Sequence, residues 1–192
     1  MFPILKKIRQ ASKLAMLNHL SQPRKHQGNH YEDHILPILS EFINTYSSQL
    51  HNIEDTIIVI LLHDILEDID RSLSKIISKI FGRRILEIIQ DLTKEDYEDF
   101  SGETTAVKKK QRDEKYLTQL LNSKYFEVRV VKSIDMIQNL SCSFRYSNDD
   151  PFTLVYIKKI IMFKEVLNSS LYLQKKANKQ KLNKLIYIEN EK

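Results

Sequence analysis

The chain has 192 residues, which is enough for one domain with a sizeable hydrophobic core. It holds only three glycines and four prolines, which is few for the tight turns of a strand-rich domain, so the composition favours an all-helical fold. A single cysteine, Cys142, excludes an internal disulfide and is typical of a reducing compartment.

The amino-terminal stretch MFPILKKIRQASKLAML has no apolar core followed by a small-residue cleavage site. No apolar segment approaches the ~18–20 residues that cross a bilayer, so we expect a cytoplasmic protein with no membrane partner. The net charge of +5 gathers in the basic runs KKIR, PRK, VKKKQR and LQKKANKQKLNK. The sequence has no zinc finger, no recognisable helix-turn-helix and no aromatic residues interleaved with the basic ones. These runs therefore indicate solvated helix faces or small anionic ligands, and they do not favour a nucleic-acid partner.

Apolar residues recur at helical spacing along most of the chain. In chain order, the predicted helices cover residues 4–19, a segment from about 33 or 34 with Pro37 in its first turn, 53–70 with Asn52 as its cap, 71–81 closed by Gly82, 83–94, 112–123, 127–140 and 152–176. Residues 21–33 are predicted as a loop, and residues 95–111 as a polar loop or lid. The pattern contains no repeat and no linker. It therefore predicts one all-α helical bundle that spans residues 1–192.

The segment IIVILLHDILEDID, residues 57–70, carries an apolar run directly into charged residues. On a helix that turns about 100° per residue, His63, Asp64, Glu67 and Asp68 lie within an arc of about 140°. The turns before them are apolar all round, which is typical of a helix buried in a bundle. Burying unpaired carboxylates is costly, and a divalent cation would offset their repulsion best. The alternative is that LEDID is the solvated end of a helix without a ligand.

Two other stretches bring polar groups onto apolar segments. In EVRVVKSIDMIQNL, residues 127–140, Asp135 and Asn139 lie one turn apart on one helix face, and Lys132 lies one turn before Asp135. A salt bridge within the helix or an N-cap would explain that pattern equally well. In PRKHQGNHYEDH, histidines and cations gather around Gly28, and His34 opens the next helix.

Taken together and in order, RK, GNHYEDH, LLHDILED, FG, LTK and VKSIDMIQNL resemble the HD-domain metal phosphohydrolases. The resemblance is closer to the hydrolase domain of the RelA/SpoT alarmone enzymes and to their stand-alone small alarmone hydrolase relatives. It runs from about Ala11 to Leu140, and residues 141–192, predicted as carboxyl-terminal helices and a basic tail, match nothing in it. The resemblance implies a single domain of the HD type that binds one Mn²⁺ ion.

The resemblance also implies roles for individual residues and a substrate. The metal ligands would be His34, His63, Asp64 and Asp135, the pair that positions and activates the attacking water would be Glu67 and Asp68, and the substrate contacts would be Arg24, Lys25, Tyr31 and Asn139. The implied substrate is guanosine tetra- or pentaphosphate, from which pyrophosphate is removed at the 3′ position. A basic loop around Lys108 to Lys110 is a further candidate for closing over the phosphates.

The chain departs from the family pattern without losing a predicted ligand. Pro37 lies three residues after His34, where the family often has proline directly after this histidine, and Gln138 stands where histidine is frequent. The chain is too short for a synthetase domain, so we expect degradation only. Two alternatives are an HD phosphohydrolase acting on another nucleotide or on a phosphomonoester, and a catalytically idle nucleotide-binding module. Intact Glu67 and Asp68 favour an enzyme over an idle module.

Overall fold

The computed structural model describes residues 3–24, 28–45, 47, 50–143 and 151–170. Within these residues every regular element is a helix, and extended pairing is limited to one isolated bridge between Pro23 and Asn29. The α-helices are α1 (Pro3–His19), α2 (Leu36–Thr45), α3 (Ile53–Leu62), α4 (Ile65–Asp68), α5 (Ser74–Phe81), α6 (Arg83–Leu92), α7 (Thr105–Asn122), α8 (Phe126–Ser143), α9 (Pro151–Met162) and α10 (Lys164–Ser169). The prediction of an all-α fold is confirmed.

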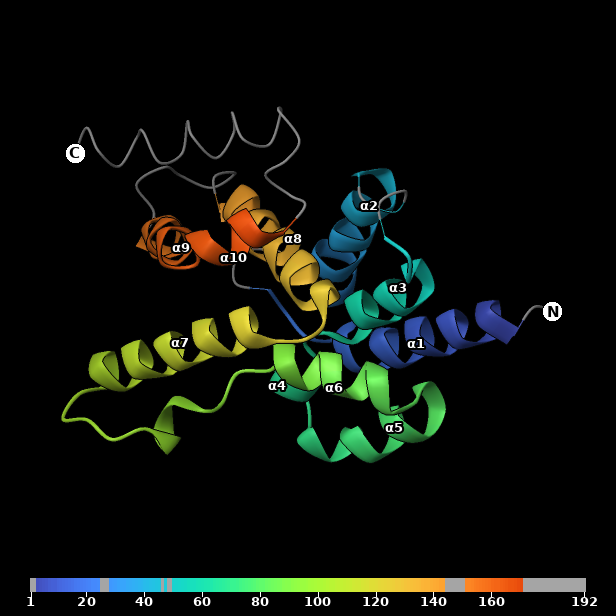
Figure 1. Ribbon diagram of the computed structural model, residues 1–192, viewed down its shortest axis with the longest axis horizontal. Helices are drawn as coiled ribbons and strands as arrows, with labels where there is room; N and C mark the ends of the chain where they lie inside the picture. The colour runs from blue at the N-terminus through green and yellow to red at the C-terminus, as the bar shows by residue number, and fades with distance from the viewer. Residues whose placement is uncertain (1–2, 25–27, 46, 48–49, 144–150, 171–192) are drawn as a thin grey trace.

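Helix α3 is the buried helix that the apolar run predicted. Its residues from Thr56 to Leu62 are buried apart from the half-buried Ile57, and the helix packs against α1, α2, α6 and α8. Helix α8 is similarly enclosed, and Figure 1 shows it near the middle of the molecule with α9 and α10 beside it. Because α3 is apolar on all sides beyond its first turn and no residue of α8 is exposed, these two helices form the centre of the bundle.

The predicted helix over residues 53–70 is interrupted at the His-Asp doublet. Helix α3 ends at Leu62, and α4 begins at Ile65. His63 and Asp64 keep helical backbone angles, and the N–H of Asp68 still donates to the carbonyl of Asp64 at 2.8 Å. The chain therefore continues in nearly the same direction through a loosened turn. This explains why the polar side chains remain on one side although the helix is not continuous.

The second predicted helix begins earlier than expected and in an unexpected form. A π-helical turn, η1 (Tyr31–Ile35), precedes α2, and the N–H of Leu36 donates to the carbonyl of Tyr31, five residues back. Pro37 follows directly; it has no N–H, and its ring would crowd the carbonyl four residues before it in an α-helix. A wider turn at this point fits that restriction, and such turns are frequent at functional sites. The turn carries His34 into the interior.

Two helix boundaries involve residues that the sequence singled out. Gly82 closes α5 with φ 96°, a left-handed backbone angle that glycine adopts without strain, as predicted. Asn52 stands at the start of α3, but its side chain does not cap the helix. Its Nδ2 instead donates to Glu127 Oε1 at 3.2 Å, so Asn52 is the N-cap residue, as predicted, but its carbonyl and not its side chain bonds to the first turn. The Asn52 side chain therefore bonds to Glu127 on α8 and not to the first turn of its own helix.

The predicted loop over residues 95–111 is shorter than expected. A 3₁₀ turn, η4 (Tyr97–Asp99), interrupts it, and α7 begins at Thr105, where the Thr104 hydroxyl accepts from the N–H of Val107 at 3.3 Å. Lys108 to Lys110 consequently lie on a helix, and Lys108 pairs with Glu98 at 2.9 Å. The expectation that Lys108 to Lys110 lie in a loop was wrong, because a threonine cap started the helix before the lysines.

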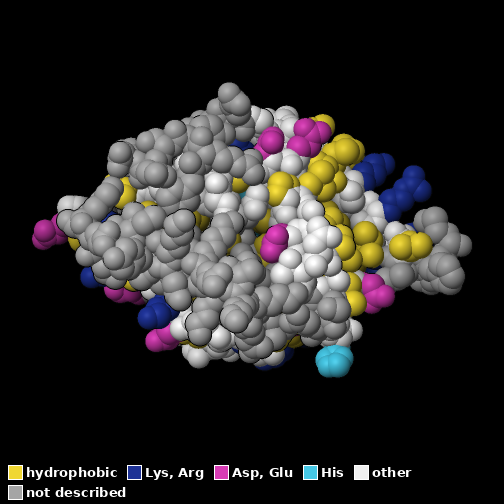
Figure 2. Space-filling view, turned by 90° about the horizontal axis from the view of Figure 1, so that it is seen from above, with side chains coloured by type: hydrophobic (Ala, Val, Ile, Leu, Met, Phe, Trp, Pro, Cys, Tyr) yellow, Lys and Arg dark blue, Asp and Glu magenta, His cyan; other side chains and the backbone are white. Residues whose placement is uncertain are grey.

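None of the described helices is long and apolar enough to span a bilayer. Figure 2 shows exposed hydrophobic side chains in a band on the half of the molecule where α2 lies. Helix α2 contributes exposed Leu36 and Ile43. The predicted basic tail falls outside the described residues.

Candidate metal centre and active-site pocket

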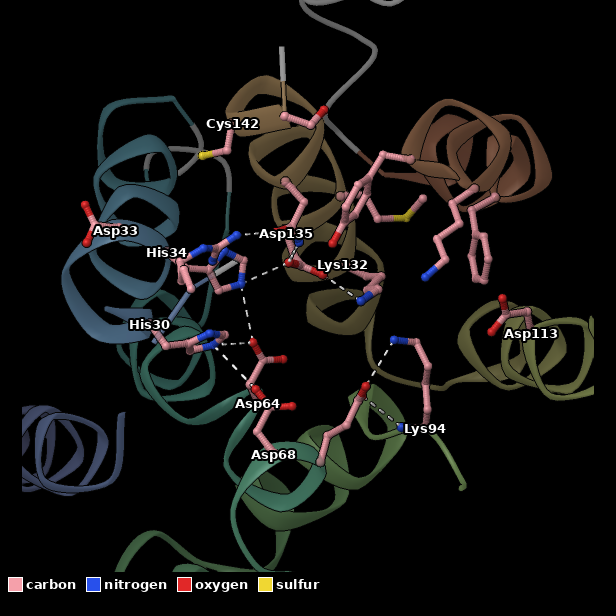
Figure 3. A pocket seen from close by; sticks show the side chains of 18 of the residues that line it. His30, Asp33, His34, Asp64, Asp68, Lys94, Asp113, Lys132, Asp135 and Cys142 are labelled. Atoms are coloured by element: carbon pink, nitrogen blue, oxygen red, sulfur yellow. Dashed lines mark hydrogen bonds and ion pairs between the residues drawn. The ribbon is translucent and has the colours of Figure 1, made fainter. Parts of the chain in front are cut away.

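A pocket of about 460 Å³ opens between α8, α9, α4 and the segment before η1. Charged and polar groups dominate its lining, with acids on the α4 side and lysines facing them across the opening (Figure 3). The residues come from positions as far apart as Pro23 and Phe163, so the fold assembles the pocket from most of the chain. A concave site with converging charged groups is the usual form of a small-molecule site.

Four of the predicted side chains converge at one end of this pocket. His34 Nε2 lies 3.3 Å from Asp64 Oδ2 and 3.2 Å from Asp135 Oδ1, and His63 Nε2 lies 3.0 Å from the same Asp64 oxygen. Donor atoms of His34, His63 and Asp135 all lie within 4.8 Å of one another. Two imidazoles and two carboxylates at this spacing are a suitable ligand set for a divalent transition metal. The structure therefore brings together all four residues of the predicted ligand set.

The hydrogen bonds of His63 identify the ring nitrogen that is left for a ligand. Its Nδ1–H donates to the carbonyl of Ile60 at 2.8 Å, which leaves the lone pair on Nε2. His63 is only 2% exposed, and Nε2 makes no hydrogen bond of regular geometry among the described residues, although it lies 3.0 Å from Asp64 Oδ2. A buried polar atom without a partner is rare, and a backbone carbonyl on the other nitrogen is the usual second contact of a metal-binding histidine. The cluster thus fits a divalent cation.

The titration behaviour of the cluster shows how strongly these groups depend on one another. Burial lowers the pKa of His63, but Asp64, together with Asp135 and the Ile60 carbonyl, outweighs burial and raises the pKa to about 9. Burial opposes the charge on Asp64, yet His63 and hydrogen bonds from His30 and His34 hold the pKa of Asp64 well below its usual range. The carboxylates are therefore ionised, and a positive charge is needed beside them. A proton on His63 and a divalent cation compete for that place.

Asp135 sits at the centre of a buried network on α8. Burial would raise its pKa, but Lys132 and the hydrogen bond from His34 lower it instead. Lys132 Nζ lies 2.6 Å from Asp135 Oδ2, and Asn139 Nδ2 donates to Asp135 Oδ1 at 2.6 Å. Arg24 Nη2 in turn donates to Asn139 Oδ1 at 2.9 Å. The one-turn spacing in the sequence thus reflects a salt bridge within the helix that also faces the pocket.

Glu67 and Asp68 line the pocket on the α4 side, and each is held by a neighbour. The Glu67 carboxylate accepts from Lys94 twice, from Nζ at 3.2 Å and from the backbone N–H at 3.3 Å. Asp68 Oδ2 accepts from Gln22 Nε2 at 2.9 Å. Their side chains are about one third exposed, so water has access to both.

Two of the predicted substrate contacts do not join the site. Tyr31 is buried, and its hydroxyl hydrogen-bonds with Ser12 on α1 at 2.8 Å, so it packs into the core and does not line the pocket. The expectation that Tyr31 faces the substrate finds no support in this geometry. Within GNHYEDH, the π turn directs the side chains of both Tyr31 and His34 into the interior, so Tyr31 is buried and does not face the pocket. Lys25 lies outside the described residues.

The family model described as "HD domain" matches residues 11–151. The chain belongs to the HD-domain family. Among solved structures, this HD-domain chain resembles a metazoan protein described as "A metazoan ortholog of SpoT hydrolyzes ppGpp and plays a role in starvation responses". The TM-score is 0.68 with 15% identity, and the match covers 95% of both chains. A comparison with curated proteins finds no match.

The structural likeness extends the sequence resemblance. Residues after Leu140 matched nothing that could be assigned from motifs, whereas the family match reaches 151 and the fold likeness includes nearly the whole chain. Helices α9 and α10 pack on α8, and α9 contributes Tyr156 and Lys159 to the pocket. The family, the fold and the His/Asp cluster together support a metal-dependent phosphohydrolase.

Several pocket residues escaped the sequence reasoning. His30 is one of them, and Figure 3 shows it pointing at Asp64 and Asp68. Its spacing from His34, one helical turn, was a usable signal that the loop prediction for residues 21–33 obscured. Lys94 and Lys159 are two more. Single lysines on separate elements carry no local pattern, so only the tertiary fold could have found them.

Proposed function

We propose that this HD-domain protein hydrolyses guanosine 3′,5′-bis(diphosphate) and the corresponding pentaphosphate, releasing pyrophosphate from the 3′ position with the help of Mn²⁺. The observation that carries the proposal is the convergence of His34, His63, Asp64 and Asp135 at one end of a pocket whose other side presents lysines. The fold likeness to a protein whose description names ppGpp hydrolysis supports this choice of substrate.

The four converging residues would hold the ion. When bound, a divalent ion lowers the pKa of a water molecule and offsets charge that develops on phosphorus. The chain's own part is to hold these ligands in place: Lys132 keeps Asp135 ionised, and the Ile60 carbonyl fixes the orientation of the His63 ring. Fixed ligands need no rearrangement during the reaction, and such preorganisation is a large part of electrostatic catalysis.

We assign Glu67 to orient the attacking water and accept its proton, and Asp68 to help position that water. Lys94 holds the Glu67 carboxylate from two directions, so its orientation is defined before substrate enters. The water oxygen attacks the phosphorus attached to the 3′ oxygen, and that phosphorus–oxygen bond breaks. Pyrophosphate leaves, and the 3′ oxygen takes up a proton in balance with the one that Glu67 receives.

We assign the polyphosphate contacts to lysines and the nucleoside contacts to the Arg24–Asn139 pair. Lys159 lines the pocket and forms no ion pair with any described residue, while burial lowers its pKa. An unpaired, partly desolvated ammonium group is a suitable partner for a phosphate. Arg24 Nη2 donates to Asn139 Oδ1 at 2.9 Å, and the planar guanidinium is suited to a base or ribose. We also propose that Lys25 contacts a phosphate, as the sequence resemblance implies.

We further infer that residues 1–192 act as a single domain in the cytoplasm. The described helices share one core from α1 to α10, and Cys142 is a free thiol, which suits a reducing compartment.

A nucleotide panel incubated with the protein and Mn²⁺ tests the function. Products are separated so that pyrophosphate is distinguished from phosphate. We expect pyrophosphate from the guanosine tetra- and pentaphosphates, loss of turnover in Glu67→Gln with the ion still bound, and normal turnover in Glu54→Gln, an exposed carboxylate on α3. Release of phosphate from a monoester, or turnover of a different nucleotide only, would show that the guanosine tetra- and pentaphosphates are not the substrates. Binding without any product would identify an idle module.

A further inference from the structure

A second group of metal-type side chains lies next to the first. Donor atoms of His19, His30 and Asp68 all lie within 4.8 Å of one another. His19 is the last residue of α1, His30 directly precedes η1, and Asp68 is the last residue of α4. The end of α1, the start of η1 and the end of α4 therefore meet beside the proposed metal centre.

His19 is the member of this group that most clearly lacks a partner. Its ring is fully buried, and its Nδ1–H donates to Gln22 Oε1 at 2.6 Å. Nε2 then carries the lone pair, and it has no hydrogen-bond partner among the described residues. Burying an acceptor of this kind without a partner costs free energy. A ligand at Nε2 would remove that cost, just as it would for His63.

His30 connects the two groups. Its Nε2 lies 2.9 Å from Asp64 Oδ2 and 3.8 Å from Asp68 Oδ2, and its ring centroid lies 4.9 Å from that of His19 (Figure 3 shows the first two contacts). The same Asp64 oxygen lies 3.0 Å from His63 Nε2. Asp64 thus stands between two imidazole sets, where a single carboxylate can be shared by two cations.

Gln22 holds the second group in place. Its amide oxygen accepts from His19 Nδ1, and its amide nitrogen donates to Asp68 Oδ2 at 2.9 Å. One side chain therefore fixes both the ring orientation of His19 and the position of the Asp68 carboxylate. Contacts of this kind, made to the ligands and not to the ion, orient the ligands of metal sites.

We propose that His19, His30 and Asp68, with Asp64 shared, form a second binding site for a divalent transition metal, adjoining the site of the proposed function. The proposal rests on the proposed function only in that Asp64 also serves the first ion. Two imidazoles with carboxylates suit Mn²⁺, Fe²⁺, Co²⁺ or Zn²⁺, whereas Mg²⁺ and Ca²⁺ prefer sites built from oxygen atoms. Asp68 would bind through Oδ2, and its second oxygen stays available to water. Phosphoryl-transfer enzymes often use such pairs of ions.

The experiment measures Mn²⁺ bound per chain by equilibrium dialysis and elemental analysis, with the fold of each variant checked by circular dichroism. The unsubstituted protein should bind two ions. His30→Gln and His19→Gln should each lose one ion, His63→Gln should lose the other, and Asp64→Asn should lose both. His51→Gln removes an exposed imidazole outside the pocket and should still bind two. His30 is partly exposed, so His30→Gln keeps the test valid if the buried His19→Gln variant fails to fold.

The outcomes separate this proposal from the proposed function. A single ion in the unsubstituted protein that is lost in His63→Gln but retained in His30→Gln would overturn the second site and leave the first intact. In that case His30 only donates a hydrogen bond to Asp64. Two ions that both persist in His30→Gln would also overturn it, as would no binding at all. Failure of every nucleotide in the panel would reject the proposed function and leave the ion count unchanged.

Discussion

Replacing Lys132 with methionine should destabilise the metal-free protein by about 3 kcal/mol. Lys132 Nζ lies 2.6 Å from Asp135 Oδ2, and the two side chains are only 12% and 5% exposed. At an effective dielectric constant of about 20, this distance corresponds to an attraction of about 6 kcal/mol, which desolvation of both groups partly offsets. Removing one partner of a buried pair typically costs about 3–5 kcal/mol. We expect the lower end because His34 and Asn139 still contact Asp135.

The assay is urea unfolding followed by circular dichroism, with and without Mn²⁺. A loss of about 3 kcal/mol lowers the midpoint by about 1–2 M urea. Lys115→Met is the matched control, because Lys115 pairs with Glu95 at 2.7 Å on the surface and should contribute less than about 1 kcal/mol. Mn²⁺ should recover part of the loss in Lys132→Met by giving Asp135 another cation. Equal midpoints for the two variants, or no effect of Mn²⁺, would refute the reasoning.

Three further predictions concern the ion and the substrate. Mn²⁺ affinity should increase as the pH rises from about 6.5 to about 9, because Asp64, acting against burial, raises the pKa of His63 to about 9 and the ion must displace that proton. The contribution of His63 to the stability of the metal-free protein runs the other way: it is fully present below 6.5 and lost as the pH rises through 9. Titration calorimetry across this range checks the first trend, and a pH-independent affinity would contradict it. Arg24→Ala should raise KM about tenfold with little change in kcat, because it removes a binding contact beside Asn139. Lys159→Gln should weaken polyphosphates more than monophosphates in competition assays, and equal effects on both would remove Lys159 from the phosphate contacts.

The helices were largely predictable because their signals are local. Apolar spacing located α1, α3, α5, α6 and α8, and the left-handed angle at Gly82 matched its predicted role as a helix end. The predictions failed where a second signal, either a local helix cap or a tertiary hydrogen bond, outweighed the one that the sequence pattern suggested. Thr104 starts α7 inside a stretch that looked like a loop, and the Asn52 side chain bonds to α8 in place of its own helix.

The candidate site was predictable only where its residues form a pattern. The His63–Asp64 doublet and the spacing of Asp135 were visible in the sequence because one helix carries each set. Lys94 and Lys159 were not, since each stands alone on its element and reaches the pocket through tertiary packing. Tyr31 shows the opposite error: a family motif suggested a substrate contact, but the π turn directs its ring to Ser12 in the core.

Anomalous diffraction from crystals soaked in Mn²⁺ tests the central claim most directly. We predict a manganese peak bounded by His34 Nε2, His63 Nε2 and the carboxylates of Asp64 and Asp135, at the end of the pocket that also contains Glu67. Manganese bound only at other places on the protein, or crystals in which these four side chains surround no metal, would contradict it.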